Sequence, residues 1–222
     1  MELENTNNLK LVMWDLDGTI LDSREAHFRS SQRVFENHGI SNTKSKTRGL
    51  FGQTTRYIFT QILGDEISPE EMNKILWEKE LAFREEVIKD AQLLPGVGRW
   101  LKEFHQRNIR QVIVSSTNKE SIITTVKALE IDMYLTDIFS GELLPSKPDP
   151  AVFSAALEAS GAEPDECLVV EDSPHGIQAA KATELKCIAA AITFPQNELA
   201  EADLVVETLE QLKWSDINDL FA

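Results

Sequence analysis

Acidic side chains follow two apolar runs of this chain, at points where buried strands would end. Asp15 and Asp17 come directly after the run Leu11–Trp14, and Glu171 and Asp172 come after the run CLVV. Carboxylates crowded into a small buried volume repel one another, so a fold gains nothing from them unless a positive group balances them. These residue types at this spacing therefore predict a site that performs chemistry.

Other polar groups lie at neighbouring places in the pattern. Ser115 and Ser116 follow the apolar run QVIV, and Lys147 lies in a Ser-Lys-Pro loop before a predicted helix. Ligands of open α/β sheets bind beyond the carboxyl ends of the strands, so we expect these groups to gather there with the carboxylates. Mg²⁺ takes oxygen ligands from carboxylates and substrate phosphate. Serine hydroxyls, amides at a helix N-terminus and a lysine ammonium suit that phosphate.

Short apolar runs alternate with helical patterns from Pro95 onward. Each run is apolar on both faces, which is typical of an α/β fold with a parallel sheet covered by helices on both sides. We predict strands at 11–14, 111–116, 137–140, 167–172, 187–192 and 202–207, and helices at 97–107, 118–129, 150–160, 175–182 and from about 208.

The segment 24–92 is predicted to be helical throughout and to interrupt the α/β pattern after its first strand. The expected helices run from an N-cap at Ser23 to Gly39, over Thr54–Leu63, and from a capping box at Ser68 to Asp90. We therefore expect an α/β core of residues 1–23 and 93–222, and a helical insert of residues 24–92.

Composition excludes several classes of protein. The net charge of −15 and the pI near 4.7 argue against binding to nucleic acid or to an anionic membrane. No apolar run approaches the length of a bilayer span, and residues 1–10 do not resemble a secretory signal, so we expect a cytoplasmic protein. Cys167 and Cys187 lie in apolar runs and are predicted to be buried thiols.

Four motifs in order resemble those of the haloacid dehalogenase superfamily: Asp15-Leu16-Asp17-Gly18-Thr19, Ser115, Lys147-Pro148 and Glu171-Asp172-Ser173. The helical insert resembles that superfamily's C1 cap. Four stretches are similar to the branch that holds phosphoglycolate phosphatase, hexose-phosphate phosphatases and β-phosphoglucomutase. They are LDSREAHF, PGV, KPDPAVF and VVEDSPHGIQAA. The resemblance implies a doubly wound, Rossmannoid core with an inserted helical cap, and a Mg²⁺-dependent phosphatase acting on a small phosphorylated metabolite such as a sugar phosphate.

The resemblance also implies a role for each motif residue. Asp15 would attack phosphorus and form an aspartyl-phosphate, and Asp17 would protonate the leaving alcohol and then activate water. Ser115, Ser116 and Lys147 would hold the phosphoryl oxygens. The Mg²⁺ ligands would be the Asp15 carboxylate, the Asp17 backbone carbonyl and Asp172, with Glu171 nearby through water.

Each of these residues also has a structural interpretation. Asp17-Gly18 could be a solvated turn, and Lys147 an ordinary surface lysine. Ser115 could cap the helix that begins near Asn118, although Ser116 or Thr117 fits that position better. The occurrence of all four motifs together favours the catalytic interpretation.

The insert contains three candidate substrate contacts. His27 lies where β-phosphoglucomutase-like proteins carry a hinge histidine, Arg56 is basic, and Lys79 could reach a phosphate or extend along the helix surface. No acidic residue occurs between Asn37 and Gly64, so a positive face and an ordinary solvated face are both open.

Two alternatives to a phosphatase remain. A phosphohexomutase would need a cap that holds a bisphosphate, but near Gly52 only Arg56 is basic, which weakens that alternative. A signalling receiver that stores phosphate on an aspartate shares the acidic pair and the lysine, but it lacks both the acid–base role of Asp17 and a helical insert of this size.

Overall fold

The computed structural model describes residues 8–50, 54–64 and 66–222. The chain divides into two compact units. One comprises the described part of Met1–Asp22 together with Gln92–Ala222, and the other comprises Ser23–Ala91.

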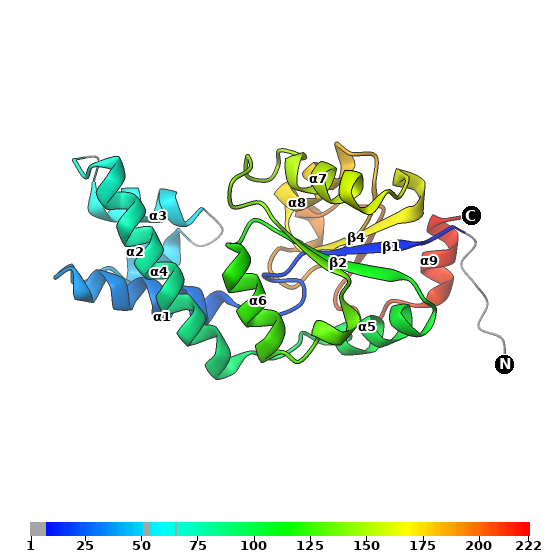
Figure 1. The fold of residues 1–222 in the computed structure, drawn as a ribbon, viewed down its shortest axis with the longest axis horizontal. Coiled ribbons are helices and arrows are strands. Elements are labelled where there is room, and N and C mark those ends of the chain that lie inside the picture. Colours follow the sequence, from blue (N-terminus) through cyan, green and yellow to red (C-terminus); the bar gives the residue numbers. More distant parts are fainter. Residues whose placement is uncertain (1–7, 51–53, 65) are drawn as a thin grey trace. The chain divides into compact units, whose positions relative to one another are not determined.

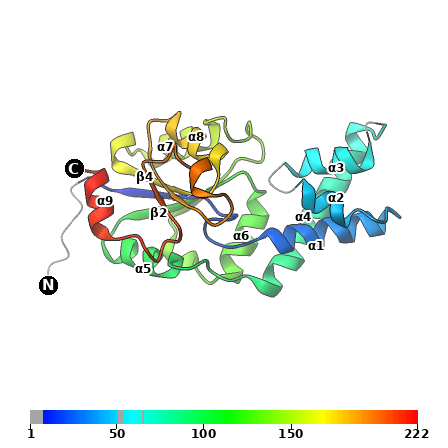
Figure 2. The same ribbon diagram turned by 180° about the vertical axis from the view of Figure 1, so that it is seen from behind.

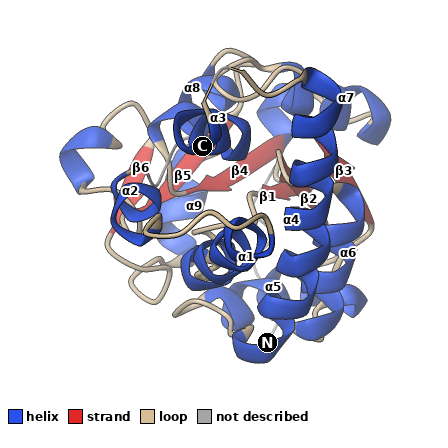
Figure 3. Cartoon of the chain, turned by 90° about the vertical axis from the view of Figure 1, so that its left-hand side faces the viewer, coloured by secondary structure: helices blue, strands red, loops and turns tan. Residues whose placement is uncertain are grey.

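The larger unit is built on a six-stranded parallel sheet in the order β3-β2-β1-β4-β5-β6 (Figure 3). Its first strand is central, and the chain adds strands first on one side of it and then on the other, as in doubly wound folds. This confirms the predicted α/β class. The strands are β1 (Leu11–Trp14), β2 (Arg110–Ser115), β3 (Asp137–Ser140), β4 (Cys167–Glu171), β5 (Lys186–Ala190) and β6 (Leu204–Val206).

Helices cover both faces of this sheet (Figures 1 and 2). On one face Leu11 and Met13 join a core with Phe153 and Ile177, which belong to helices α7 and α8. On the other face the Trp14 ring lies 6.1 Å from that of Phe104. Because both faces are covered, β1 is fully buried. The helices of this unit are α5 (Val97–Gln106), α6 (Lys119–Ala128), α7 (Ala151–Ser160), α8 (Pro174–Lys181) and α9 (Trp214–Leu220).

The last helix begins later than the sequence predicts, at Trp214 rather than near Thr208. The backbone carbonyls just before it are engaged by side chains of α5. Arg99 donates hydrogen bonds to the carbonyls of Leu209, Glu210 and Leu212, and Trp100 donates to that of Leu209. The prediction was wrong because these tertiary bonds replace the bonds that a helix would make.

The smaller unit is helical where it is described, and α1 packs along α4 (Figure 1). Ser68 and Thr54 cap their helices by accepting hydrogen bonds from the backbone amides of Glu71 and Tyr57. Ser23 occupies the N-cap position of its helix but makes no side-chain capping bond. The helices are α1 (Arg24–Asn37), α2 (Lys44–Gly49), which was not predicted as a separate helix, α3 (Thr55–Leu63) and α4 (Pro69–Asp90).

Candidate active site

The register of the sheet brings the acidic ends of β1 and β4 together. Trp14 pairs with Val170, and the Asp15 amide donates to the Val170 carbonyl at 3.0 Å. Asp15 therefore leaves β1 directly beside Glu171, the last residue of β4. Ser115 ends β2 on the other side of β1. The predicted gathering of these groups at the carboxyl edge follows from a parallel sheet with β1 between β2 and β4.

Lys147 joins two of these carboxylates. Its Nζ donates to Asp15 Oδ1 and to Glu171 Oε1, both at 2.7 Å, and to the Val114 carbonyl at 3.3 Å. Burial opposes the positive charge, but Asp15 and Glu171 outweigh burial and raise the pKa of Lys147 above its usual value. The lysine is therefore a fixed ammonium inside the site.

Glu171 is held rigidly by its neighbours. Its Oε2 accepts hydrogen bonds from the Asp172 amide at 2.9 Å and from the amide and hydroxyl of Ser173, each at 3.0 Å. Gly176 leaves the space that this carboxylate fills, since a Cβ there would lie 1.8 Å from Glu171 Oε1. Glu171 therefore holds Lys147 in place with little freedom of its own.

Three carboxylates form a group suited to a cation. One oxygen from each of Asp15, Glu171 and Asp172 lies within 4.8 Å of the others. Burial, with the nearby carboxylates, raises the pKa of Asp15 well above its usual value and that of Asp172 to about 7. When all three carboxyl groups are ionised, the one ammonium leaves excess negative charge. The donors are all oxygen, which fits a hard divalent cation.

The loop after β1 approaches Asp172 closely because residue 18 is glycine. Gly18 has φ +93°, and a Cβ there would lie 2.1 Å from Asp172 Oδ2 and 2.6 Å from Thr193 Oγ1. Thr19 donates to Asp172 Oδ1 at 3.3 Å, and the Thr193 side chain also hydrogen-bonds to Asp172. Any side chain at position 18 would displace the carboxylate.

Asp17 lies on the β2 side of the site. Its Oδ2 accepts a hydrogen bond from Thr117 Oγ1 at 2.7 Å. Ser115 is buried, Ser116 is exposed, and the Ser115 hydroxyl accepts from the Thr117 amide at 3.1 Å. The α6 cap is neither Ser116 nor Thr117 but Asn118, whose side chain accepts from the amides of Glu120 and Ser121. The two hydroxyl residues before it therefore face other partners or solvent.

The three candidate residues of the insert contact neighbours within the helical unit. Lys79 is only 1% exposed, and its Nζ lies 2.9 Å from His27 Nδ1 and 3.0 Å from Glu80 Oε1. The His27 ring stacks on Phe83. Arg56 donates to Asn73 at 2.5 Å. Lys79 does not extend along the helix surface, and a contact of these residues with substrate stays a prediction.

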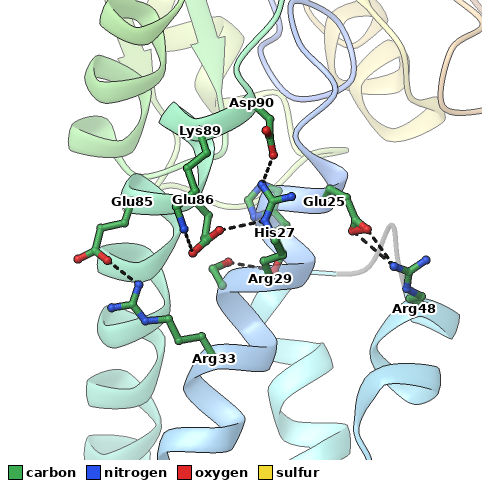
Figure 4. A network of polar contacts seen from close by, with 10 residues as sticks. Glu25, His27, Arg29, Arg33, Arg48, Glu85, Glu86, Lys89 and Asp90 are labelled. Atoms are coloured by element: carbon green, nitrogen blue, oxygen red, sulfur yellow. Dashed lines mark hydrogen bonds and ion pairs between the residues drawn. The ribbon is translucent and has the colours of Figure 1, made fainter.

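Ion pairs between helices hold the insert together (Figure 4). Arg29 of α1 bonds Glu86 at 2.9 Å and Asp90 at 2.6 Å on α4. Arg48, one of the basic residues between Asn37 and Gly64, pairs with Glu25 at 2.9 Å (Figure 4). Part of the positive charge of that segment is thus balanced locally.

Several residues of this edge were not identified from the sequence as parts of the site. Thr117 directly follows Ser115-Ser116, so extending the predicted phosphate-binding run by one hydroxyl residue would have included it. Gly176 and Thr193 carry no local signal, because their importance depends on close approach to Glu171 and Asp172. Thr19 ends the first motif, and its hydroxyl donates to Asp172.

The chain is similar to known proteins over almost its whole length. It is 27% identical over 215 residues to validoxylamine A 7′-phosphate phosphatase of Streptomyces hygroscopicus subsp. limoneus, covering 94% of this chain and 98% of that protein. It is 28% identical over 211 residues to β-phosphoglucomutase of Bacillus subtilis strain 168, covering 92% of each.

A solved structure of a HAD hydrolase, family IA, variant 3, from Entamoeba histolytica HM-1:IMSS has the same fold, with a TM-score of 0.85 at 22% identity over 96% of this chain and 99% of that one. Among the described residues, no helix is both long and apolar enough to cross a membrane. Residues 12–190 match the family of haloacid dehalogenase-like hydrolases, and the chain therefore belongs to that family.

Proposed function

We propose that this protein is a Mg²⁺-dependent phosphatase that hydrolyses small phosphorylated metabolites, such as sugar phosphates or phosphoglycolate-like acids, through an aspartyl-phosphate. The observation that carries the proposal is the position of Lys147, which bridges Asp15 and Glu171 at the edge of the sheet. An ammonium there suits a phosphoryl oxygen next to a carboxylate nucleophile. The relatives named phosphatase agree with this chemistry.

Asp15 is the nucleophile in this proposal. Its carboxylate follows the buried β1 strand directly, so the backbone fixes the attacking oxygen. Lys147 holds Asp15 Oδ1 and neutralises charge on the transferring phosphoryl group, helped by the Ser115 hydroxyl and the Ser116 amide. Asp17 gives a proton to the leaving alcohol and then takes one from the attacking water.

The donor set at this edge fits Mg²⁺. The carboxylates of Asp15 and Asp172 and the backbone carbonyl of Asp17 would hold the ion, with Glu171 nearby through water, since Glu171 already accepts bonds at both oxygens. Bound there, the ion supplies positive charge that offsets repulsion between the phosphate and the carboxylates.

A phosphohexomutase is the second candidate, favoured by the similarity to a protein named β-phosphoglucomutase. Both reactions begin with the same aspartyl-phosphate, and they differ in whether water or a second sugar phosphate accepts the group. A receiver module has no comparable support, because the family that matches is one of hydrolases.

A screen of phosphate esters separates the two candidates. The purified protein is incubated with Mg²⁺ and each ester, including glucose 1-phosphate with and without a hexose bisphosphate. Release of inorganic phosphate from several esters supports the phosphatase, and isomerised sugar without net release supports the mutase. If no ester is turned over, the proposed function is wrong.

A further inference from the structure

The contact between Thr117 and Asp17 has no part in the function proposed above. Thr117 Oγ1 donates to Asp17 Oδ2 at 2.7 Å, and both side chains are half-buried. The bond joins the loop after β1 to the loop after β2, two segments that are 100 residues apart in the sequence. A short bond between such distant segments fixes the plane of the carboxyl group.

Thr117 is itself held on both sides of its backbone. Its amide donates to Ser115 Oγ at 3.1 Å, and its carbonyl accepts from Ser140 Oγ at 2.7 Å. The next residue, Asn118, donates to Glu142 Oε1 at 2.6 Å. Strands β2 and β3 therefore determine where the Thr117 hydroxyl lies, and through it where Asp17 lies.

We infer that Thr117 is a positioning residue that orients Asp17 for proton transfer in both halves of the reaction; the inference rests on the proposed function. A carboxyl oxygen without the proton keeps lone pairs, so Oδ2 can accept the Thr117 bond whether Oδ1 is protonated or not. We assign the transferred proton to Oδ1.

The protons and bonds balance in both steps. In the first, an Asp15 oxygen bonds to phosphorus, the bond between phosphorus and the ester oxygen breaks, and the Oδ1 proton moves to that ester oxygen. In the second, a water oxygen bonds to phosphorus, its proton returns to Oδ1, and the bond between phosphorus and Asp15 breaks. Thr117 keeps its own proton throughout.

This role predicts a dependence on the leaving group that a purely structural role would not produce. A nitrophenolate leaves without a proton, whereas the alkoxide of a sugar or glycerol ester needs one in the transition state. Loss of the Thr117 hydroxyl should therefore slow the first transfer step on alkyl esters much more than on p-nitrophenyl phosphate.

The experiment compares kcat/KM of the wild type with that of Thr117→Val and Thr117→Ser, on p-nitrophenyl phosphate and on the best alkyl ester from the screen. This ratio reports the steps up to the first phosphoryl transfer and excludes hydrolysis of the aspartyl-phosphate, which is common to both esters. Thr117→Val should lower kcat/KM on the alkyl ester by about tenfold to a hundredfold, as expected for a lost hydrogen bond to a charged group. Its kcat/KM on the aryl ester should change by less than about threefold, and Thr117→Ser should restore activity on the alkyl ester.

Thr125→Val is the matched control, since Thr125 donates to the Ser121 carbonyl at 2.9 Å within α6 and does not contact Asp17. The ratio of its kcat/KM to that of the wild type should be the same on both esters. Adding Thr117→Val to Asp17→Asn should cause no further loss on the alkyl ester.

Equal losses of kcat/KM on both esters, no loss in Thr117→Val, or additive effects with Asp17→Asn would overturn the inference. Should Thr117→Val fail to fold, the same comparison of the two esters with Thr117→Ala tests the inference. If the wild type releases no phosphate from any ester, the proposed function fails instead, so the two failures are distinguishable.

Discussion

The raised pKa of Asp172 makes the stability of the metal-free protein depend on pH. Burial, with the charge of Glu171, raises this pKa from about 3.8 to about 7. The folded state therefore binds a proton that the unfolded state has already released, and stability falls as the pH rises between the two values. Asp15, whose pKa is also raised, acts in the same direction.

The size of the effect follows from the two pKa values of Asp172. The stabilisation that comes from its protonation is complete below about pH 4, falls as the pH rises, and is lost above about pH 7. Between pH 5 and pH 8 Asp172 alone should lower the unfolding free energy by about 2–3 kcal/mol, from linkage at 1.36 kcal/mol per pKa unit. Mg²⁺ binds the ionised carboxylates, so its stabilising effect should be larger at pH 8. A Mg²⁺ concentration about 100 times its Kd at that pH would add about 2.7 kcal/mol to the unfolding free energy.

Urea unfolding measures this directly. Unfolding free energies are compared at pH 5 and pH 8, with and without Mg²⁺, for the wild type, Asp172→Asn and Asp203→Asn. Asp172→Asn should remove the part of the pH dependence that Asp172 contributes, and the fall in stability that remains should come from Asp15. Asp203 is the matched control, because its pKa is lowered and it bonds Lys181 and the Cys187 amide away from the site. Its asparagine variant should lose stability about equally at both pH values.

The reasoning would be refuted by a wild-type stability that is flat or rises between pH 5 and pH 8. It would also be refuted by an Asp172→Asn variant that keeps the full pH dependence, or by Mg²⁺ stabilising the protein equally at both pH values.

Two further predictions concern the geometry and the metal. Gly176→Ala should lower the unfolding free energy by about 1–3 kcal/mol and reduce turnover, because the new Cβ displaces Glu171 and with it Lys147. Gly49→Ala is the control and should do neither, since a Cβ at position 49 meets nothing within 4 Å. Equal unfolding curves and rates for Gly176→Ala and the wild type would contradict the prediction that the space at Gly176 is needed for Glu171. Chelation should abolish phosphate release and added Mg²⁺ should restore it, and turnover that persists in excess chelator would exclude the metal proposal.

Much of the larger unit could be predicted from local patterns. Strand β1 was predicted with its observed bounds, because a short run that is apolar on both faces and ends in charge is typical of a buried parallel strand. Asp15, Ser115 and Glu171 were identified in the same way, since each marks the end of such a run. A strand that ends in a polar group is a signal contained in the sequence itself.

The features that were missed depend on tertiary contacts. The start of α9 is delayed because Arg99 and Trp100 engage the carbonyls before it, and no pattern around Thr208 records that. The importance of Gly176 is set by a carboxylate that arrives from β4. Asn118 rather than Ser116 or Thr117 caps α6, although all of them are acceptable cap residues.

The central claim is that Asp15 carries the phosphoryl group during turnover. The most direct measurement is an acid quench of the enzyme during reaction with a hydrolysed ester and Mg²⁺, followed by peptide mapping of the covalent phosphate. We predict phosphate on the peptide that contains Asp15 in the wild type, and neither covalent phosphate nor turnover in a folded Asp15→Asn variant. Phosphate on another residue, or turnover by Asp15→Asn near the wild-type rate, would contradict the account.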